Sequence, residues 1–489
     1  MAWLTKSRFM SGRQCPKRLW FEVNEPLEEK PLDSLPLING RKFDDLVRTL
    51  QPGTVISRER GMPAAIAETT RVMGAGSTAV LYQPAFRFGD LAVIADVLRR
   101  EQHEFSLMEV KASTQVKDIH IPDAAFQALV LRGVRIPVTR VFVGHVDRQF
   151  VLERTGDYEG LLVEEDVTER VAAIVAEVAD NAKALQAVMA ASEVPAIAMG
   201  PQCSDPYECP FIPRCSKARG AVPDYPVDLL PRGAHAAQAL AAAGYLDLRD
   251  VPAASLTSDT HRRVHAATVS GIPYFDAAAT EELRAHELPR AYLDFETISF
   301  AVPELLGTHP YEQLPFQWSL HVEDAGNDMH HVAYLAIDSF GNFAELAKAL
   351  LDAVPVTGPV FAYNAGFERG VLAGLADRLP EYSQALLDLA GRLVDLLPIT
   401  RDAYYHRDMK GSWSIKAVLP TIAPGLAYAE LDDVQESGAA QLAFVELREA
   451  GISAERREKL TQSLREYCRR DTWGMVVLRR FLCGEPTGN

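Results

Sequence analysis

Two acidic side chains alternate within a short apolar segment of the C-terminal half. Residues 291–297 read AYLDFET, so Asp294 and Glu296 stand two positions apart. Side chains at positions i and i+2 of a β-strand project from the same face. Unpaired buried carboxylates are costly and like charges repel, which indicates that a cation lies between the two. The segment therefore predicts a metal site.

Further metal ligands are predicted at the start of one helix and within another. VFAYNAGFERGVL contributes Glu368, and EYCRRDTWGMVVL contributes Asp471, one helical turn after Tyr467. Two divalent ions about 3.5–4 Å apart need several carboxylates from different elements. The carboxylates that would supply them are Asp294, Glu296, Glu368 and Asp471.

These segments together resemble the DEDD superfamily of proofreading-type exonucleases, which have a ribonuclease H-like fold. The match rests on D-x-E at 294–296, N-x-x-F-E at 364–368 and Y-x-x-x-D at 467–471. Tyr467 is similar to the tyrosine branch of the superfamily. The second motif usually ends in Asp, whereas this chain has Glu368, whose longer arm must fold back to reach a metal.

The resemblance implies hydrolysis of phosphodiester bonds from the 3′ end with Mg²⁺ or Mn²⁺. One ion would lower the pKa of the attacking water, and the other would stabilise the leaving 3′ oxygen. Tyr467 would orient that water, and an aromatic side chain could stack on a terminal base. The predicted substrate contacts are Phe316, Gln317 and Asn364. A core strand with packed aromatic side chains is the alternative interpretation of residues 316–318.

A second acidic pattern lies in the N-terminal half, in VIADVLRREQHEFSLMEVKAST (93–114). Asp96 falls in one apolar strand, and Glu109 and Lys111 share one face of the next strand. Two carboxylates can bind Mg²⁺ or Mn²⁺, while a lysine can position water or stabilise charge on a phosphate. An E-x-K sequence alone also arises by chance in amphipathic strands.

This D…E-x-K pattern resembles the restriction-endonuclease-like, or PD-(D/E)XK, nucleases. The helix predicted at 123–133 carries Gln127 and is similar to the Q-x-x-x-Y helix of RecB-like members, although Leu131 replaces the tyrosine. Asp44 stands where the first helix of that family often has histidine. The resemblance implies that Gln127 contacts nucleic acid, and it assigns catalytic roles to Asp96, Glu109 and Lys111.

Four of the six cysteines flank this N-terminal region. One is early and three are late in the region: Cys15, Cys203, Cys209 and Cys215. Clustered cysteines in a cytosolic protein indicate metal binding before disulfides. Four thiolates can hold zinc or an iron–sulfur cluster, and the close cysteine pairs usual for zinc are missing. The order resembles iron–sulfur RecB-like nucleases, including CRISPR-associated ones, which implies a [4Fe–4S] cluster and action on single-stranded DNA.

The composition bounds the remaining possibilities. The chain has 489 residues and a net charge of −16, which argues against a nonspecific polycation that coats nucleic acid. The first twenty residues nevertheless contain only basic charges: Lys6, Arg8, Arg13, Lys17 and Arg18. Neither a membrane span nor a signal peptide is expected, so we predict a cytoplasmic protein.

We therefore predict an α/β multidomain protein with three parts. They are a RecB-like PD-(D/E)XK domain at 1–220, a helical linker at 221–288 and a DEDD ribonuclease H-like domain at 289–489. A helix–hairpin–helix turn at 241–252 is an alternative to a plain linker. The whole arrangement resembles an uncharacterised bacterial family that joins these two nuclease types.

The predicted function is metal-dependent hydrolysis of DNA, at single strands or DNA ends, in DNA repair, CRISPR adaptation or defence against mobile elements. Two other interpretations stay open. In one, a single domain is catalytic and the other is a nucleic-acid scaffold; in the other, the chain is a non-enzymatic adaptor stabilised by zinc. No pattern reads a base edge or a 2′-hydroxyl, so RNA remains an alternative to DNA.

Overall fold

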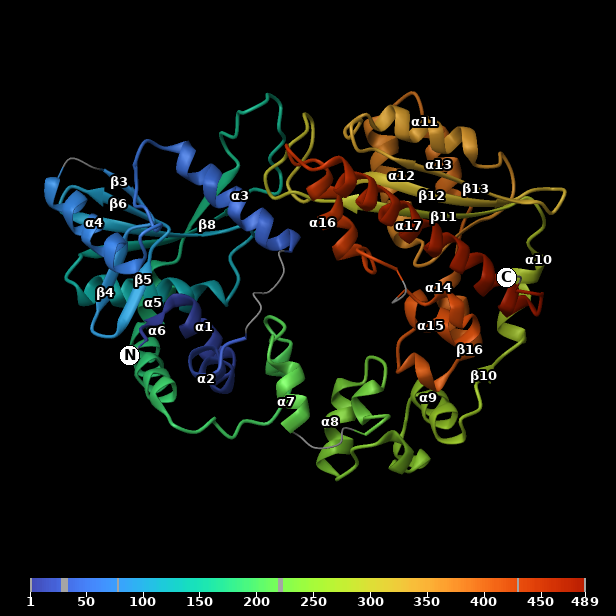
Figure 1. The fold of residues 1–489 in the computed structure, drawn as a ribbon, viewed down its shortest axis with the longest axis horizontal. Coiled ribbons are helices and arrows are strands. Elements are labelled where there is room, and N and C mark those ends of the chain that lie inside the picture. The colour runs from blue at the N-terminus through green and yellow to red at the C-terminus, as the bar shows by residue number, and fades with distance from the viewer. Residues whose placement is uncertain (1, 28–33, 77–78, 219–222, 429–430, 488–489) are drawn as a thin grey trace. The chain divides into compact units, whose positions relative to one another are not determined.

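The chain folds into two compact units (Figure 1). The structure is a computed structural model, and it describes residues 2–27, 34–76, 79–218, 223–428 and 431–487. One unit comprises Met1–Ala221 with Ser299–Glu312, and the other comprises Val222–Ile298 with Gln313–Asn489. Both units combine helices with mixed sheets, which confirms the predicted α/β multidomain class. Among the described helices, none is long and apolar enough to cross a membrane.

The larger sheet of the first unit has the strand order β2-β3-β6-β7-β8-β9. Its strands are β2 (Thr54–Val55), β3 (Val80–Tyr82), β6 (Val97–Glu101), β7 (Glu104–Lys111), β8 (Val138–Val146) and β9 (Leu162–Asp166). β7 pairs antiparallel with β6 and parallel with β8. A parallel pair needs a crossover connection, and here α5 (His120–Gly133) supplies it. The carboxylates of β7 and the polar side chains of α5 are therefore adjacent.

The smaller sheet of this unit has the order β1-β5-β4. Its strands are β1 (Leu4–Thr5), β4 (Ala85–Phe88) and β5 (Leu91–Ile94). The apolar run that the sequence suggested as one strand is thus divided between β5 and β6, and Asp96 lies at the break. The side chain of Asp96 accepts a hydrogen bond from the Val110 backbone N–H at 2.9 Å, which fixes the break beside β7.

The first unit has further helices, and several of them form its core with the sheets. They are α1 (Lys6–Gln14), α2 (Pro16–Asn24), α3 (Leu35–Leu50), α4 (Met62–Ala75), α6 (Thr168–Ala190) and α7 (Ile212–Ala218). Phe9 of α1 stacks on Phe126 of α5 with ring centroids 4.7 Å apart. Cys15 separates α1 from α2 in an extended conformation, and Pro16 suits the first helical position because it needs no N–H partner there.

Residues 299–312 leave the second unit's sheet and pack on the first unit. Asn39 of α3 donates a hydrogen bond to the Ser299 carbonyl at 3.1 Å, and Tyr311 donates one to the Ala112 carbonyl. Ala301 is buried among apolar side chains of the first unit. The local sequence did not suggest this excursion.

The sheet of the second unit has the order β13-β12-β11-β14-β15. Its strands are β11 (Arg290–Ile298), β12 (Leu314–Glu323), β13 (Met329–Leu335), β14 (Val360–Ala362) and β15 (Leu393–Asp395). β12 runs antiparallel to both β11 and β13, while β14 runs parallel to β11 and β15. β11 lies at the centre of the sheet, so a strand flanks it at each edge.

Helices pack on both faces of this sheet (Figure 1). They are α11 (Phe343–Ala353), α12 (Gly366–Arg378), α13 (Ser383–Gly391), α14 (Leu396–Ala403), α15 (Ile415–Ile422), α16 (Ser437–Leu447) and α17 (Ala454–Cys483). α17 lies along β11 and β12, where Gln317 donates a hydrogen bond to the Leu464 carbonyl at 2.9 Å. This hydrogen bond holds α17 against β12, beside the acidic segment of β11.

The predicted linker groups with the second unit. Its elements are α8 (Ala234–Ala242), α9 (Asp259–Ser270), β10 (Tyr274–Phe275) and α10 (Glu281–Ala285), and β10 pairs with β16 (Tyr404–Tyr405). Gly244 closes α8 with a φ of +92°, a conformation that favours glycine. The chain then forms a 3₁₀ turn at Leu248–Asp250 instead of the second long helix of a hairpin.

Candidate active sites and metal centres

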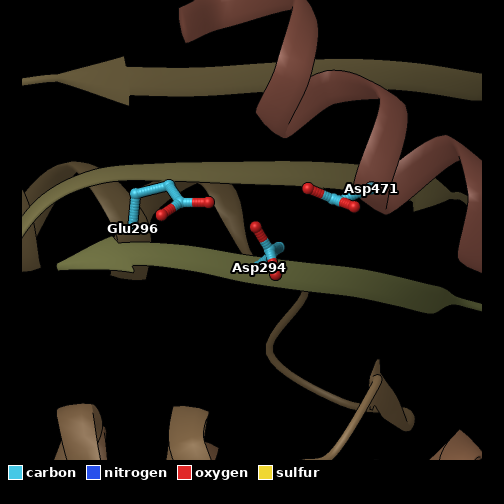
Figure 2. Close-up of side chains that lie close together, drawn as sticks. All are labelled: Asp294, Glu296 and Asp471. Atoms are coloured by element: carbon cyan, nitrogen blue, oxygen red, sulfur yellow. The ribbon is translucent and has the colours of Figure 1, made fainter. Parts of the chain in front are cut away.

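Three carboxylates of the second unit meet above its central strand. Asp294 and Glu296 rise from β11, and Asp471 comes down from α17 (Figure 2). One oxygen of each side chain lies within 4.8 Å of the others, a grouping found at this place among the described residues. Carboxylates bind divalent cations through oxygens 2.0–2.6 Å from the ion, so this spacing suits a shared cation. The i, i+2 pattern of β11 and the packing of α17 over that strand thus bring together three predicted ligands.

Burial makes these carboxylates hard to ionise when no cation is present. Burial and the neighbouring Asp471 carboxylate raise the pKa of both Asp294 and Glu296 well above their usual range. Burial raises the pKa of Asp471 to about 6, although hydrogen bonding by Tyr428 and the charge of Lys416 oppose the rise. A divalent cation would remove this penalty by placing positive charge among the oxygens.

Glu368 lines the same cavity, of about 330 Å³, but stands outside the 4.8 Å group. It lies in the first turn of α12, and its Oε2 atom is buried with no hydrogen-bond partner among the described residues. Burial, followed by the charge of Asp395, raises its pKa to about 8. The longer side chain of Glu368 therefore does not bring its oxygens within 4.8 Å of the other three carboxylates. A cation entering the cavity would give this oxygen a partner.

Side chains that the motifs do not include surround the carboxylates. The Tyr428 hydroxyl donates a hydrogen bond to Asp471, and the Cys468 thiol donates one to Asp294 with a sulfur–oxygen distance of 3.3 Å. Lys416 lines the cavity, with its Nζ 4.9 Å from the ring centre of Tyr467. Cys468 lies one residue after Tyr467 on α17, so helix geometry could have suggested it; nothing local pointed to Tyr428 or Lys416.

The predicted substrate contacts divide into two groups. Phe316 and Gln317 are fully buried on β12, where Phe316 stacks on Phe444 at 4.1 Å and Gln317 bonds α17. Neither lines the cavity, so the predicted substrate role of these two is wrong and the packed-strand interpretation describes them. Asn364 does line the cavity. Its φ is +70°, and its backbone N–H bonds Asp395 at 3.0 Å, which holds the turn before α12.

Metal binding at this site should strengthen as the pH rises from about 6 to 8.5. Glu368, with a pKa of about 8, and Asp471, with a pKa of about 6, must each lose a proton before they bind an ion. Titration calorimetry with Mn²⁺ should show this increase in affinity. Glu368→Gln should remove the part of the increase that occurs near pH 8. An Mn²⁺ affinity that stays constant across this pH range would contradict the prediction.

The predicted N-terminal residues also meet at one place in the first unit. Glu109 is fully buried, and its carboxylate accepts hydrogen bonds from Lys111 Nζ at 2.6 Å and from Gln127 of α5. Asp96 is close enough for the charge of Glu109, after burial, to raise its pKa well above the usual range. The strand break, the E-x-K strand and the following helix therefore form one polar centre.

Two residues that sequence reasoning did not assign complete this centre. Lys6, the first residue of α1, places its Nζ 2.7 Å from a Glu109 oxygen and 3.8 Å from Asp96. Asp123 of α5 lies 3.6 Å from the same ammonium and accepts a 2.6 Å hydrogen bond from Lys111. Burial would raise the pKa of Glu109, but the two lysines hold it well below its usual range.

Asp44 and Leu131, the two departures from the RecB-like pattern, occupy different environments. Asp44 of α3 forms an ion pair with Arg48 at 2.9 Å. It is near enough to the centre for the charge of Glu109 to contribute, after burial, to a raised pKa. Leu131 is fully buried in the apolar core, so α5 offers no polar group at that position.

The predicted cysteines converge in the first unit. Cys15, Cys203, Cys209 and Cys215 line one small cavity together with Lys17 and Arg18. Burial raises the pKa of Cys209 and Cys215, and the charges of Cys15 and Cys203 add to this effect. Sulfurs on a tetrahedral zinc ion lie about 3.8 Å apart. Among the described residues, the four sulfurs do not form a group within 4.8 Å of one another.

If the four thiolates hold the predicted iron–sulfur cluster, Cys209→Ala should remove its visible absorption band near ~400 nm from anaerobically purified protein, because the cluster loses a ligand. The residue is buried beside Phe211 and the other thiols, so the loss should also lower the stability of the first unit. Cys483→Ala, at the end of α17, is the matched control and should keep the colour. A colourless wild-type protein that holds one zinc ion would contradict the cluster assignment.

The chain is similar to a protein family and to a protein whose descriptions state no activity. A family model described as a domain of unknown function (DUF2779) matches residues 291–414, which include Asp294, Glu296 and Glu368. "Uncharacterized protein MG366 homolog" of Mycoplasma pneumoniae (strain ATCC 29342 / M129 / Subtype 1) is 26% identical over 212 residues. The match covers 40% of this chain and 32% of that protein, so the chain spans about a third of the relative it matches.

Proposed function

We propose that the chain is a metal-dependent nuclease whose second unit hydrolyses phosphodiester bonds from the 3′ end of a strand. The observation that carries this proposal is the meeting of Asp294, Glu296 and Asp471 in one cavity with Tyr467. Structural acids on a protein surface are usually solvated or paired with bases. Here Glu296 and Asp471 are buried, Asp294 is half-buried, and the three are close together and resistant to ionisation, which is the environment of carboxylates that hold cations.

The sheet of the second unit supports a ribonuclease H-like assignment. In chain order its strands are arranged 3-2-1-4-5, and only the second runs against the others. This arrangement is the one expected of that fold. The ligands come from the first strand and the last long helix, as the DEDD resemblance implies.

Each side chain has a role in the proposed reaction. Mg²⁺ or Mn²⁺ bound here would lower the pKa of a water and neutralise charge on the leaving oxygen. Asp294, Glu296 and Asp471 would hold the ions, and Tyr428 fixes one Asp471 oxygen through its hydrogen bond. The Tyr467 hydroxyl, 3.3 Å from Ser437 Oγ, would orient the attacking water.

The first unit is proposed to be a RecB-like nuclease domain with a [4Fe–4S] cluster that acts on single-stranded DNA or DNA ends. Asp96 and Glu109 would bind Mg²⁺ or Mn²⁺, and Lys111 would stabilise charge on the phosphate. The pairing of β7 with β6 and β8, and the crossover helix with Gln127, support this reading. Lys17 and Arg18 beside the thiols would offset the negative charge of the cluster.

One observation favours a second candidate for the first unit. The Lys6 ammonium lies among Asp96, Glu109 and Asp123, the position that a divalent cation would take. If lysine is the resident cation, this unit is a scaffold that binds nucleic acid, and only the second unit is catalytic.

The direct test is hydrolysis of end-labelled strands by anaerobically purified protein. Single- and double-stranded DNA and RNA would be incubated with Mn²⁺, Mg²⁺ or EDTA. With a 5′ label we expect a ladder of shortened products, and with a 3′ label we expect early release of one labelled nucleotide. Absence of metal-dependent hydrolysis on all four substrates would overturn the proposal.

A further inference from the structure

A second, larger cavity of the second unit is lined by a basic and aromatic set of side chains. Its volume is about 550 Å³. The side chains that define it, which we call the arginine–tryptophan pocket, are His321, His331, Glu466, Arg469, Arg470 and Trp473. The whole chain has a net charge of −16. The two adjacent arginines beside an aromatic ring therefore make this cavity a basic region on an acidic protein.

The cavity of about 330 Å³ that is lined by Asp294, Glu296 and Asp471 is called the carboxylate cavity below. Neighbouring stripes of α17 line this cavity and the arginine–tryptophan pocket. Glu466, Arg469, Arg470 and Trp473 follow the i, i+3, i+4, i+7 spacing that defines one face of α17. Tyr467 and Asp471 lie on an adjacent stripe and line the carboxylate cavity. The two cavities therefore lie beside each other along α17.

The two arginines of the pocket share one ion-pair partner, Glu466, among the described residues. Among the described residues, Arg469 has one ion pair, with Glu466 at 3.7 Å, and its side chain is 57% exposed. Arg470 is held more firmly, because it donates to the Ala427 carbonyl at 2.7 Å and lies 3.7 Å from the same carboxylate. Two guanidinium groups share one acid, which leaves a net positive charge for an anionic group such as a phosphate.

The aromatic side of the pocket is uncharged and held in place. The His321 ring centre lies 4.5 Å from that of His331 and 5.5 Å from that of Trp473. Burial lowers the pKa of His321 to about 3 and that of His331 to about 4, so both rings are neutral at physiological pH. Thr472 bonds His321 at 2.8 Å, which fixes the ring.

We propose that the arginine–tryptophan pocket binds a segment of single-stranded nucleic acid, with its phosphates at Arg469 and Arg470 and a base stacked on Trp473. A groove that combines cations for the backbone with an aromatic surface for the bases is the usual solution for single strands. The inference deepens the proposed function, on which it rests for the identity of the strand: the bound segment belongs to the strand whose end enters the carboxylate cavity.

Binding can be measured without catalysis. Fluorescence anisotropy of a labelled 12-nucleotide oligothymidine, in EDTA and with full-length protein, should show about tenfold weaker binding for Arg469→Ala and for Trp473→Leu. Arg469→Ala should also reduce the slope of log affinity against log salt by about 0.7. Arg465→Ala is the matched control, since this exposed arginine lies on α17 outside the pocket.

A second readout separates this pocket from any strand-binding site in the first unit. An oligonucleotide with 5-iodouracil, photocrosslinked to the full chain, should label the tryptic peptide 471–479, which contains Trp473. Labelling only of peptides from the first unit, or variants that bind like Arg465→Ala, would overturn the inference. Competition by thymidine monophosphate that is as strong, per nucleotide, as competition by the unlabelled oligonucleotide would also overturn it, since the pocket would then take a free nucleotide. Crosslinking at 471–479 without Mn²⁺-dependent hydrolysis would support this pocket and remove the nuclease proposal.

Discussion

Asp294→Asn is expected to reduce the Mn²⁺-dependent release of 3′ nucleotides by about a thousandfold. The substitution keeps the size of the side chain but removes a charge that two metal ions would share with Glu296 and Asp471. Metal stabilisation of the transition state contributes several kcal/mol, and each 1.36 kcal/mol corresponds to tenfold in rate. Single-turnover assays with a 3′-labelled strand measure this loss directly.

Two companion variants make that result interpretable. Asp388→Asn, on the exposed face of α13 in the same unit, removes one carboxylate that does not line the cavity and should leave the rate unchanged. Asp96→Asn alters only the N-terminal centre, so it should spare the 3′ release and affect any cleavage by the first unit. Full 3′ release by Asp294→Asn would show that the carboxylate cavity is not the exonuclease site.

Lys6→Met should destabilise the metal-free first unit by about 3–5 kcal/mol, because removal of one partner of a buried ion pair leaves uncompensated charge. The carboxylates left behind are those of Asp96, Glu109 and Asp123. The same change also removes the Lys6 ammonium group from the position that a divalent cation would take. Mn²⁺ should therefore bind the variant more tightly than the wild type and restore part of its stability. Urea unfolding with and without Mn²⁺ measures both effects.

The comparison variant is Lys183→Met, an exposed lysine of α6 in the same unit, which should change stability very little. The Mn²⁺ response of Lys6→Met decides between the two candidates for the first unit. Recovery of stability with Mn²⁺ supports a metal-dependent nuclease centre. A destabilised variant that Mn²⁺ does not rescue supports the scaffold, with lysine as its permanent cation.

Some parts of both sites could be predicted because they depend on local geometry. Alternation along a strand places Asp294 beside Glu296 and Glu109 beside Lys111, whatever the rest of the chain does. One helical turn places Tyr467 beside Asp471 for the same reason. The convergence of the four cysteines was predicted from their positions at the two ends of one region, and all four line one cavity.

Other parts required the three-dimensional arrangement. Phe316 and Gln317 follow the first acidic motif closely in sequence, yet the pairing of β12 with β11 and its cover by α17 bury them. Asp123 is twelve positions from Lys111, and only the return of α5 over β7 brings the two together. Tyr428 reaches Asp471 across 43 positions by the same kind of packing.

The sequence by itself determined the α/β class, the types of side chain that could do chemistry and their pairing within single strands and helices. Only the tertiary structure decided that Lys6 lies among the N-terminal carboxylates and that Glu368 falls short of the other three acids. It also decided that α17 carries a basic stripe beside the one with Tyr467 and Asp471. The physical reason is that backbone geometry fixes neighbours within an element, whereas contacts between elements depend on how their apolar faces pack.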